Sequence, residues 1–137
     1  DPECQAIMAR LDNDLFELIN LAVNDKLDEV KIAWKKEKSI CVVLCSKGYP
    51  DGYDNNVEIK NLNKIYLDLD KDSFIFHAGT YEKQGKVFSN GGRVLNITSL
   101  SEDLLEARDK VIEYLNKINW KNGYFRKDIG WRTINKK

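Results

Sequence analysis

The segment S-F-I-F-H-A-G-T-Y-E-K-Q-G-K-V-F-S-N-G-G-R-V-L-N-I-T spans residues 73 to 98 and decides how the chain folds. It predicts two extended runs around a polar turn, followed by a third apolar run. Phe74-Ile75-Phe76 is a run of strand formers that ends at Gly79. Gln84-Gly85 supplies the turn, and Val87-Phe88 restarts the extended chain. The pattern therefore indicates antiparallel strands.

Two adjacent glycines and an arginine follow the second extended run, as Asn90-Gly91-Gly92-Arg93. Paired glycines in a strand pattern indicate a positive φ, a bulge, or backbone pressed close against another group. The planar guanidinium of Arg93 suits a phosphate or a carboxylate. On these residues alone two interpretations stay open. One is an anion site, and the other is a bulge or hairpin corner next to a solvated edge charge.

Six short motifs, taken in order and spacing, connect the chain to a known family. They are D-P-E-C-Q at 1–5, S-K-G-Y-P at 46–50, H-A-G-T at 77–80, N-G-G-R-V-L at 90–95, L-E-A-R at 105–108 and R-K-D-I-G-W-R at 126–132. With these motifs the chain resembles the carboxy-terminal domain of the phosphoribosylamine–glycine ligases, which are ATP-grasp enzymes of purine synthesis. The resemblance covers essentially the whole sequence.

The resemblance implies an ATP-dependent carbon–nitrogen ligase that converts ATP, glycine and 5-phosphoribosylamine to glycinamide ribonucleotide, ADP and phosphate. It implies that ATP and magnesium bind in an amino-terminal part of the enzyme that is not in this sequence. We therefore expect the chain alone to be inactive, and to have the ATP-grasp lobes of its own polypeptide and small-molecule substrates as partners. A cytoplasmic location, without membrane or nucleic-acid binding, is expected.

Substrate contacts are expected at three places, and no catalytic residue or metal ligand is assigned to this chain. Arg93, with the backbone of Asn90, Gly91 and Gly92, is expected to help hold the ribose phosphate. The resemblance also places the helix start at Asp1 and Pro2 beside the substrate pocket, and the loop with Lys47 and Tyr49 towards the cleft. The residues alone explain the same features as a helix cap and a rigid turn.

The expected fold class is α+β, with two amino-terminal helices and an antiparallel barrel-sandwich-type domain that carries one long helix. Residues 1–36 are expected to be the terminal helices and linker of an ATP-grasp domain, and residues 37–137 the carboxy-terminal domain. A helix starting at Asp12 or Asn13 has an apolar stripe. Residues 39–46 predict a strand buried on both faces, and 57–59 and 65–69 predict half-exposed strands.

The long helix is expected from about Leu104 to Ile118, behind a capping box of Ser99 and Glu102. Glu106 and Lys110 are expected to form a favourable i, i+4 pair on its exposed side. Tyr124-Phe125 could add a final strand. His77, the single histidine, is interpreted as packed or hydrogen-bonded rather than as a base.

The composition, with 22 basic and 22 acidic residues, argues against broad nucleic-acid binding. Cys4, Cys41 and Cys45 lack metal-ligand spacing and are interpreted as free thiols. The basic segment 126–132 is either a docking tail with Asp128 paired to an arginine or a second anion contact, and docking is favoured.

One rival function remains, a non-catalytic carrier module of the biotinyl or lipoyl kind. Such modules present a lysine at a hairpin tip, flanked by Met or Asp. Lys83, at the predicted hairpin, lies in Glu82-Lys83-Gln84, which lacks this pattern.

Overall fold

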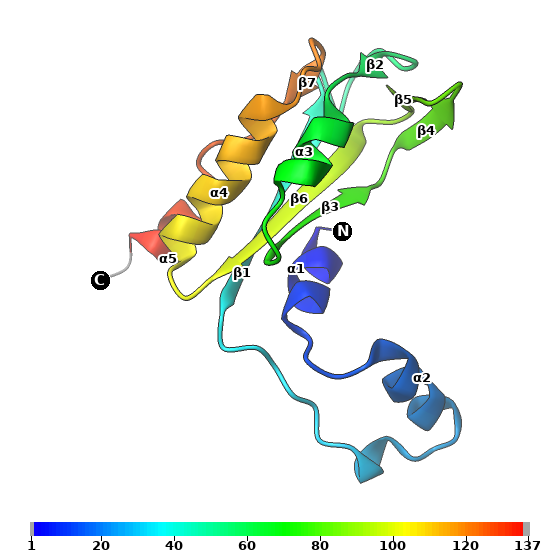
Figure 1. Cartoon of the computed structure of the whole chain (residues 1–137), viewed down its shortest axis with the longest axis vertical. Helices are drawn as coiled ribbons and strands as arrows, with labels where there is room; N and C mark the ends of the chain where they lie inside the picture. The colour runs from blue at the N-terminus through cyan, green and yellow to red at the C-terminus, as the bar shows by residue number, and fades with distance from the viewer. Residues whose placement is uncertain (1, 136–137) are drawn as a thin grey trace.

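The computed structural model describes residues 2–135 and shows an α+β fold, as expected. A four-stranded antiparallel sheet forms the centre and a three-stranded sheet lies towards one end, while α1 lies against the central sheet and the segment with α2 extends beyond the other end (Figure 1). The helices are α1 (Glu3–Arg10), α2 (Leu15–Val23), the 3₁₀ helix η1 (Leu27–Glu29), α3 (Leu62–Asp68), α4 (Leu104–Lys117) and α5 (Trp131–Ile134). The strands are β1 (Lys38–Ser46), β2 (Glu58–Ile59), β3 (Ser73–His77), β4 (Thr80–Lys83), β5 (Lys86–Ser89), β6 (Arg93–Ser101) and β7 (Gly123–Tyr124).

The central sheet has the order β3-β6-β1-β7 and is covered on both faces. Side chains of a strand point alternately to its two faces. Ile40, Val42 and Leu44 of β1 therefore share one face, and they pack in the core with Ala107 and Val111 of α4. The intervening residues of β1 lie on the other face, next to α1. This arrangement confirms the strand predicted at 39–46.

A separate sheet with the order β2-β5-β4 contains the predicted hairpin. Gln84 (φ 54°) and Gly85 (φ 72°) both lie in the left-handed region, which is the requirement of a two-residue type I′ turn. The short strand expected at 57–59 is present as β2, which pairs with β5. Within residues 2–135 the two sheets stay separate and do not close into a barrel.

The strand predicted at 65–69 is wrong, because this segment is the helix α3. Leu62 and Ile65, three residues apart, are buried on one side of the helix, whereas Leu67 is 87% exposed. The alternation of Ile65, Leu67 and Leu69 suggested a strand, but the burial follows the helical spacing.

The long helix α4 begins with a cap that differs from the predicted capping box. The Asp103 carboxylate accepts hydrogen bonds from the backbone N–H groups of Leu105 (2.7 Å) and Glu106 (3.1 Å). Ser99 lies inside β6, so it cannot cap the helix. The hydroxyl of Ser101, at the end of β6, instead donates to Glu106 Oε2 at 2.5 Å.

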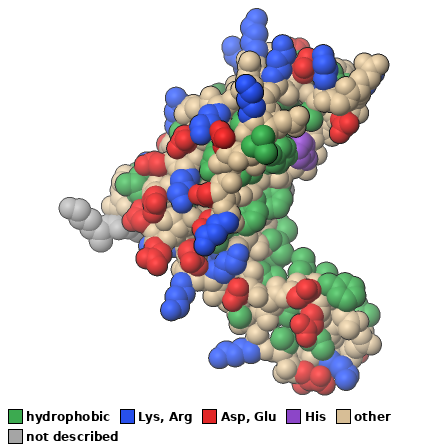
Figure 2. Space-filling view, in the orientation of Figure 1, with side chains coloured by type: hydrophobic (Ala, Val, Ile, Leu, Met, Phe, Trp, Pro, Cys, Tyr) green, Lys and Arg blue, Asp and Glu red, His purple; other side chains and the backbone are tan. Residues whose placement is uncertain are grey.

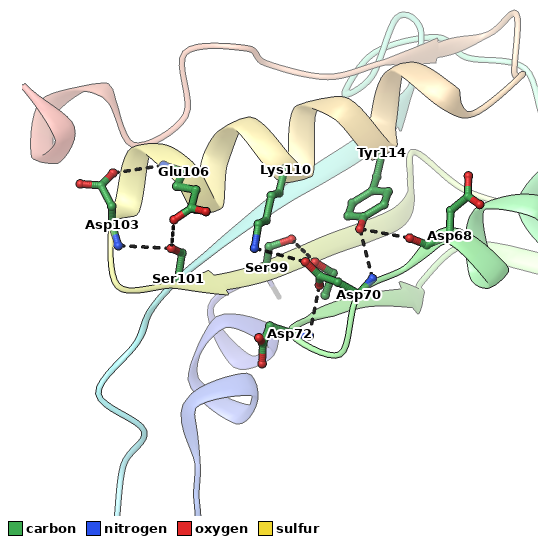
Figure 3. A network of polar contacts seen from close by, with 10 residues as sticks. Asp68, Asp70, Asp72, Ser99, Ser101, Asp103, Glu106, Lys110 and Tyr114 are labelled. Atoms are coloured by element: carbon green, nitrogen blue, oxygen red, sulfur yellow. Dashed lines mark hydrogen bonds and ion pairs between the residues drawn. The ribbon is translucent and has the colours of Figure 1, made fainter.

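A polar network ties α4 to the loop before β3 (Figure 3). The Tyr114 hydroxyl accepts from the Asp70 backbone N–H (3.2 Å) and donates to the Asp68 carbonyl (3.4 Å). Lys110 Nζ lies 3.2 Å from Asp70 Oδ2. The expected pair of Lys110 with Glu106 is therefore replaced by an ion pair between two elements, because the loop brings a carboxylate to the same side of the helix.

The amino-terminal segment exposes many apolar side chains. Asp14, rather than Asp12 or Asn13, caps α2 by accepting from the Glu17 backbone N–H at 3.1 Å. Phe16 and Val23 of α2 are each 78% exposed. Figure 2 shows apolar side chains gathered on the lobe that this segment forms. Further exposed apolar side chains of the segment are Ile7, Leu15, Ile19, Leu27, Ile32 and Trp34.

The Asp70 carboxylate gives the fold a specific pH dependence. Burial raises its pKa, but hydrogen bonds from Ser73 and Lys110 outweigh burial, and the net pKa lies below the usual value. A carboxyl group whose pKa is lower in the folded state stabilises the fold above its unfolded pKa of about 3.9, and this stabilisation is lost as the pH falls through the folded value. Because the pair is about one-third exposed, we expect Asp70→Asn to lower the free energy of unfolding near pH 7 by only about 0.5–1 kcal/mol.

Urea unfolding of both proteins at several pH values would measure this difference, which should shrink towards zero as the pH falls through the lowered pKa of Asp70. Asp109→Asn removes a carboxylate from an exposed pair on the outer side of α4 and serves as the control. If Asp70→Asn lowers the free energy of unfolding equally at neutral and acidic pH, the ionised Asp70 carboxylate is not the source of the stabilisation.

Candidate functional site

A cavity of about 350 Å³ lies over the carboxyl end of β1, on the face of the sheet opposite α4. It brings together Pro2 at the start of α1, Tyr49 from the loop after β1, and Arg93 at the start of β6. These three sequence-predicted residues are far apart in the chain. Further lining residues are Cys41, Val42, Val43, Cys45, Tyr124, Phe125, Arg126 and Ile129.

A bulge in β6 turns Arg93 towards the cavity. Leu44 pairs with Leu95, but the next residue of β1, Cys45, pairs with Arg93, so Val94 is the extra residue. In a regular strand Arg93 and Leu95 would share a face. The bulge instead puts Arg93 on the face of Cys45, while Leu95 stays in the core. A bulge was one of the two interpretations of the glycine–arginine segment. In the structure, this bulge orients Arg93 towards the cavity.

The loop before β6 is fixed to the end of β1. The Ser46 backbone N–H donates to the Gly92 carbonyl, and the Ser46 hydroxyl donates to the Gly91 carbonyl, each at 2.8 Å. Ser46 is fully buried, so both bonds are shielded from water. They hold the segment before Arg93 at a defined position.

Gly92 is required by the ring of Tyr49. A Cβ atom at position 92 would lie 2.0 Å from Tyr49 Cδ2. This contact is the close approach that the paired glycines predicted. Gly79 has a similar role, since a Cβ there would lie 2.6 Å from the Arg93 carbonyl oxygen, where the β3–β4 turn crosses the start of β6.

Among the described residues, three further expected site residues do not line the cavity, namely Lys47, Asn90 and Gly91. The Asn90 backbone N–H donates to the Gly79 carbonyl at 2.8 Å, so Asn90 and Gly91 connect the turns instead of lining the cavity. Lys47 is exposed and its backbone N–H donates to Asn122. Asp1 lies outside the described residues.

The tail after β7 supplies the wall that sequence reasoning did not assign to the site. Tyr124 pairs with Cys45 on the opposite side of β1 from Arg93, and the chain then runs along the cavity through Phe125, Arg126 and Ile129. The sequence did indicate Arg126, because the basic motif at 126–132 was interpreted as either a docking tail or a second anion contact. Its position on the cavity depends on the pairing of β7, which two residues alone do not predict.

The cavity combines an apolar floor with two cationic side chains. Burial raises the pKa of the Cys45 thiol, and the positive charge of Arg93 opposes that shift. Burial also raises the pKa of Cys41. Arg93 and Arg126 line the cavity, whereas no carboxylate of residues 2–135 does. Such a lining suits an anionic group attached to a less polar body.

His77 lies away from the cavity and is hydrogen-bonded, as expected. Its Nε2 lies 2.6 Å from the Tyr66 hydroxyl, and its Nδ1 lies 2.6 Å from Thr80 Oγ1. Burial lowers its pKa, so the neutral ring is favoured. These contacts join α3 to the β3–β4 turn, and they give His77 a structural role.

Comparison with known proteins identifies relatives for nearly the whole chain. Residues 39–132 match the family model described as phosphoribosylglycinamide synthetase, C domain. The chain is 43% identical over 135 residues to a phosphoribosylamine–glycine ligase of Brucella melitensis, with 98% of this chain and 31% of the relative covered. It is 41% identical over 138 residues to the chloroplastic enzyme of Arabidopsis thaliana, with 100% and 26% covered.

A solved structure has the same fold. The crystal structure of the phosphoribosylamine–glycine ligase from Thermotoga maritima superposes with a TM-score of 0.61 at 32% sequence identity. The match covers 82% of this chain and 27% of that one. The chain thus spans about a third or less of the length of these relatives.

The contact between Gly92 and Tyr49 gives a direct test of the cavity geometry. Gly92→Ala places a methyl group in overlap with the edge of the Tyr49 ring, and the resulting overpacking should lower the free energy of unfolding by about 1–3 kcal/mol. Gly52→Ala is the matched control, because a Cβ at Gly52 meets no atom within 4 Å. Thermal or urea unfolding measures both.

Tyr49→Ala combined with Gly92→Ala identifies the cause. If the clash is with the ring, the double variant should be more stable than the sum of the two single changes predicts. Strict additivity would show that the ring is not what excludes a side chain at position 92.

Proposed function

The chain belongs to the phosphoribosylglycinamide synthetase C-domain family, and we propose that it acts as the carboxy-terminal domain of a phosphoribosylamine–glycine ligase. The proposed reaction joins glycine to 5-phosphoribosylamine at the expense of ATP, giving glycinamide ribonucleotide, ADP and phosphate. Support comes from relatives that carry this name and are identical to the chain at 40% or more of the aligned positions, over 98% or more of the length of this chain.

One observation carries the assignment of the binding site. Arg93 and the start of α1 line the same cavity, although 91 positions separate Pro2 from Arg93 in the sequence. We assign Arg93 to bind the phosphate of the ribose substrate. Tyr49 forms the part of the cavity wall that is assigned to position the sugar. Lys47, Asn90 and Gly91 do not line the cavity, and we assign no direct contact with the phosphate to their side chains.

Binding and positioning are the contributions proposed for these residues. A guanidinium forms charge-assisted hydrogen bonds to phosphate, each worth roughly 1.5–3 kcal/mol when its partners are shielded from water. The apolar floor lowers the local dielectric and strengthens this attraction. Holding the sugar phosphate fixes the amine relative to the activated carboxyl group, which is how ligases of this type gain rate without a protein nucleophile.

ATP and magnesium are assigned to another part of the ligase. Residues 2–135 contain no group of three or more His, Cys, Asp or Glu side chains that could hold a metal ion. No step through the metal is assigned to these residues.

A cytoplasmic location is part of the proposal. No helix among the described residues is both long and apolar enough to cross a membrane.

The exposed apolar side chains of the amino-terminal segment support a domain boundary near residue 36. We assign residues 1–36 to the end of the ATP-grasp domain and residues 37–137 to the carboxy-terminal domain. The family model begins at residue 39, next to this boundary. The apolar face of α2, with Phe16 and Val23, would then pack against the ATP-grasp lobes of the same polypeptide.

Replacing Arg93 tests the binding site. In the ligase that contains this domain, Arg93→Ala should raise the KM for phosphoribosylamine about tenfold or more, because one charge-assisted contact is lost. The KM for ATP should hardly change. Steady-state kinetics with each substrate varied in turn gives both values.

The matched control is Arg108→Ala. Arg108 is paired with Asp109 on α4, on the opposite face of the sheet from the cavity. Its removal should leave every KM within about twofold of the parent value, which is below the effect of a lost charged contact. An unchanged KM for phosphoribosylamine in Arg93→Ala would reject the phosphate assignment.

A further inference from the structure

Arg126 reaches the cavity from the side opposite Arg93. In the central sheet, β1 lies between β6 and β7. Cys45, near the end of β1, pairs with Arg93 on one side and with Tyr124 on the other. Two residues beyond Tyr124, Arg126 lines the same cavity as Arg93. The sheet therefore brings the two arginine residues to the two sides of one cavity.

The Arg126 guanidinium is held in a fixed orientation by Asp128. Its Nε donates to Asp128 Oδ1 at 3.0 Å, and its Nη2 donates to Asp128 Oδ2 at 2.8 Å. This two-bonded fork uses two of the five N–H donors of the guanidinium. Asp128 does not line the cavity, whereas Arg126 does. The Arg126–Asp128 pair therefore lies at the border between this cavity and a neighbouring hollow that both residues line.

The apolar residues of the same tail explain how the segment can both dock and bind. Phe125 and Ile129 pack against the hydrophobic core. They anchor the tail on each side of Arg126 and leave its side chain 59% exposed at the cavity wall. A tail whose only task was to cover the core would not need an oriented cation between these two anchors.

We propose that Arg126 is a specificity-determining residue that binds the anionic group of the ligand together with Arg93, and that Asp128 positions it. This inference rests on the proposed function, because it takes the ligand to be a sugar phosphate. Two cations on opposite walls favour a doubly charged phosphate over a sugar without one, since each guanidinium contributes its own charge-assisted bonds.

Kinetics of three variants in the ligase that contains this domain tests the role of Arg126. Arg126→Ala should raise the KM for phosphoribosylamine about five- to tenfold, with kcat within about twofold and unchanged KM values for glycine and ATP. Arg126→Lys keeps the charge but cannot form the same fork with Asp128, so its KM should be intermediate. Arg132→Ala is the control, because Arg132 lies over the Trp131 ring and does not line the cavity.

The outcomes separate this inference from the proposed function. If Arg93→Ala raises the KM while Arg126→Ala behaves like Arg132→Ala, the role of Arg126 is rejected and the proposed function stands. If neither Arg93→Ala nor Arg126→Ala changes the KM, both are rejected. A KM of Arg126→Lys equal to that of the parent would reject the positioning role of Asp128.

Cysteine labelling adds a measurement that does not depend on turnover. Cys45 lines the cavity, whereas Cys4 is exposed on α1 and does not line it. Ribose 5-phosphate is the probe, and alkylation is followed residue by residue by peptide mass spectrometry at alkaline pH, because burial raises the pKa of Cys45. The probe should slow labelling of Cys45 but not of Cys4, and Arg126→Ala should remove most of this protection. Equal protection in the parent and in Arg126→Ala would overturn the inference.

Discussion

The antiparallel pairing of β1 with β6 is the constraint on which the rest of the structure depends. These are the two longest strands, and their inward side chains form the floor on which α4 packs. The burial of apolar strand side chains such as Val42 and Ile97 beneath α4 fixes the register, because a slip by one residue would move those of the shifted strand to the other face. The register in turn decides that Cys45 meets Arg93 at one edge and Tyr124 at the other.

The candidate site exists because this regular pairing is broken at one point. The bulge at Val94 lets Leu95 remain in the core while Arg93 turns to the opposite face. Hydrogen bonds from the buried Ser46 and the contact of Gly92 with Tyr49 hold the broken segment in place. The charge of the whole chain is zero, so its binding character comes from this local arrangement of cations above apolar side chains and not from a general surface potential.

Local sequence patterns predicted those parts of the fold whose signals are local. The hairpin at Gln84-Gly85 and the buried strand at 39–46 were of this kind, because turn chemistry and a continuous apolar run act over a few residues. The helix α3 was missed because Ile65, Leu67 and Leu69 alternate like a strand, and only tertiary packing makes Leu62 and Ile65 the buried pair. For the site, the glycines and Arg93 were recognisable in the sequence. Arg126 could be assigned to the same cavity only from the pairing of β7 with β1, which is a contact between distant segments.

The exposed face of α2 has a consequence for the fate of the chain in a cell. Side chains such as Phe16 and Val23 present to water the type of surface that molecular chaperones bind and that quality-control proteases recognise in incompletely assembled proteins. A copy whose α2 face stays uncovered would therefore be marked for retention or degradation, even though its central sheet is fully folded. Exposure of the α2 face would then distinguish copies that have not been assembled from those that have.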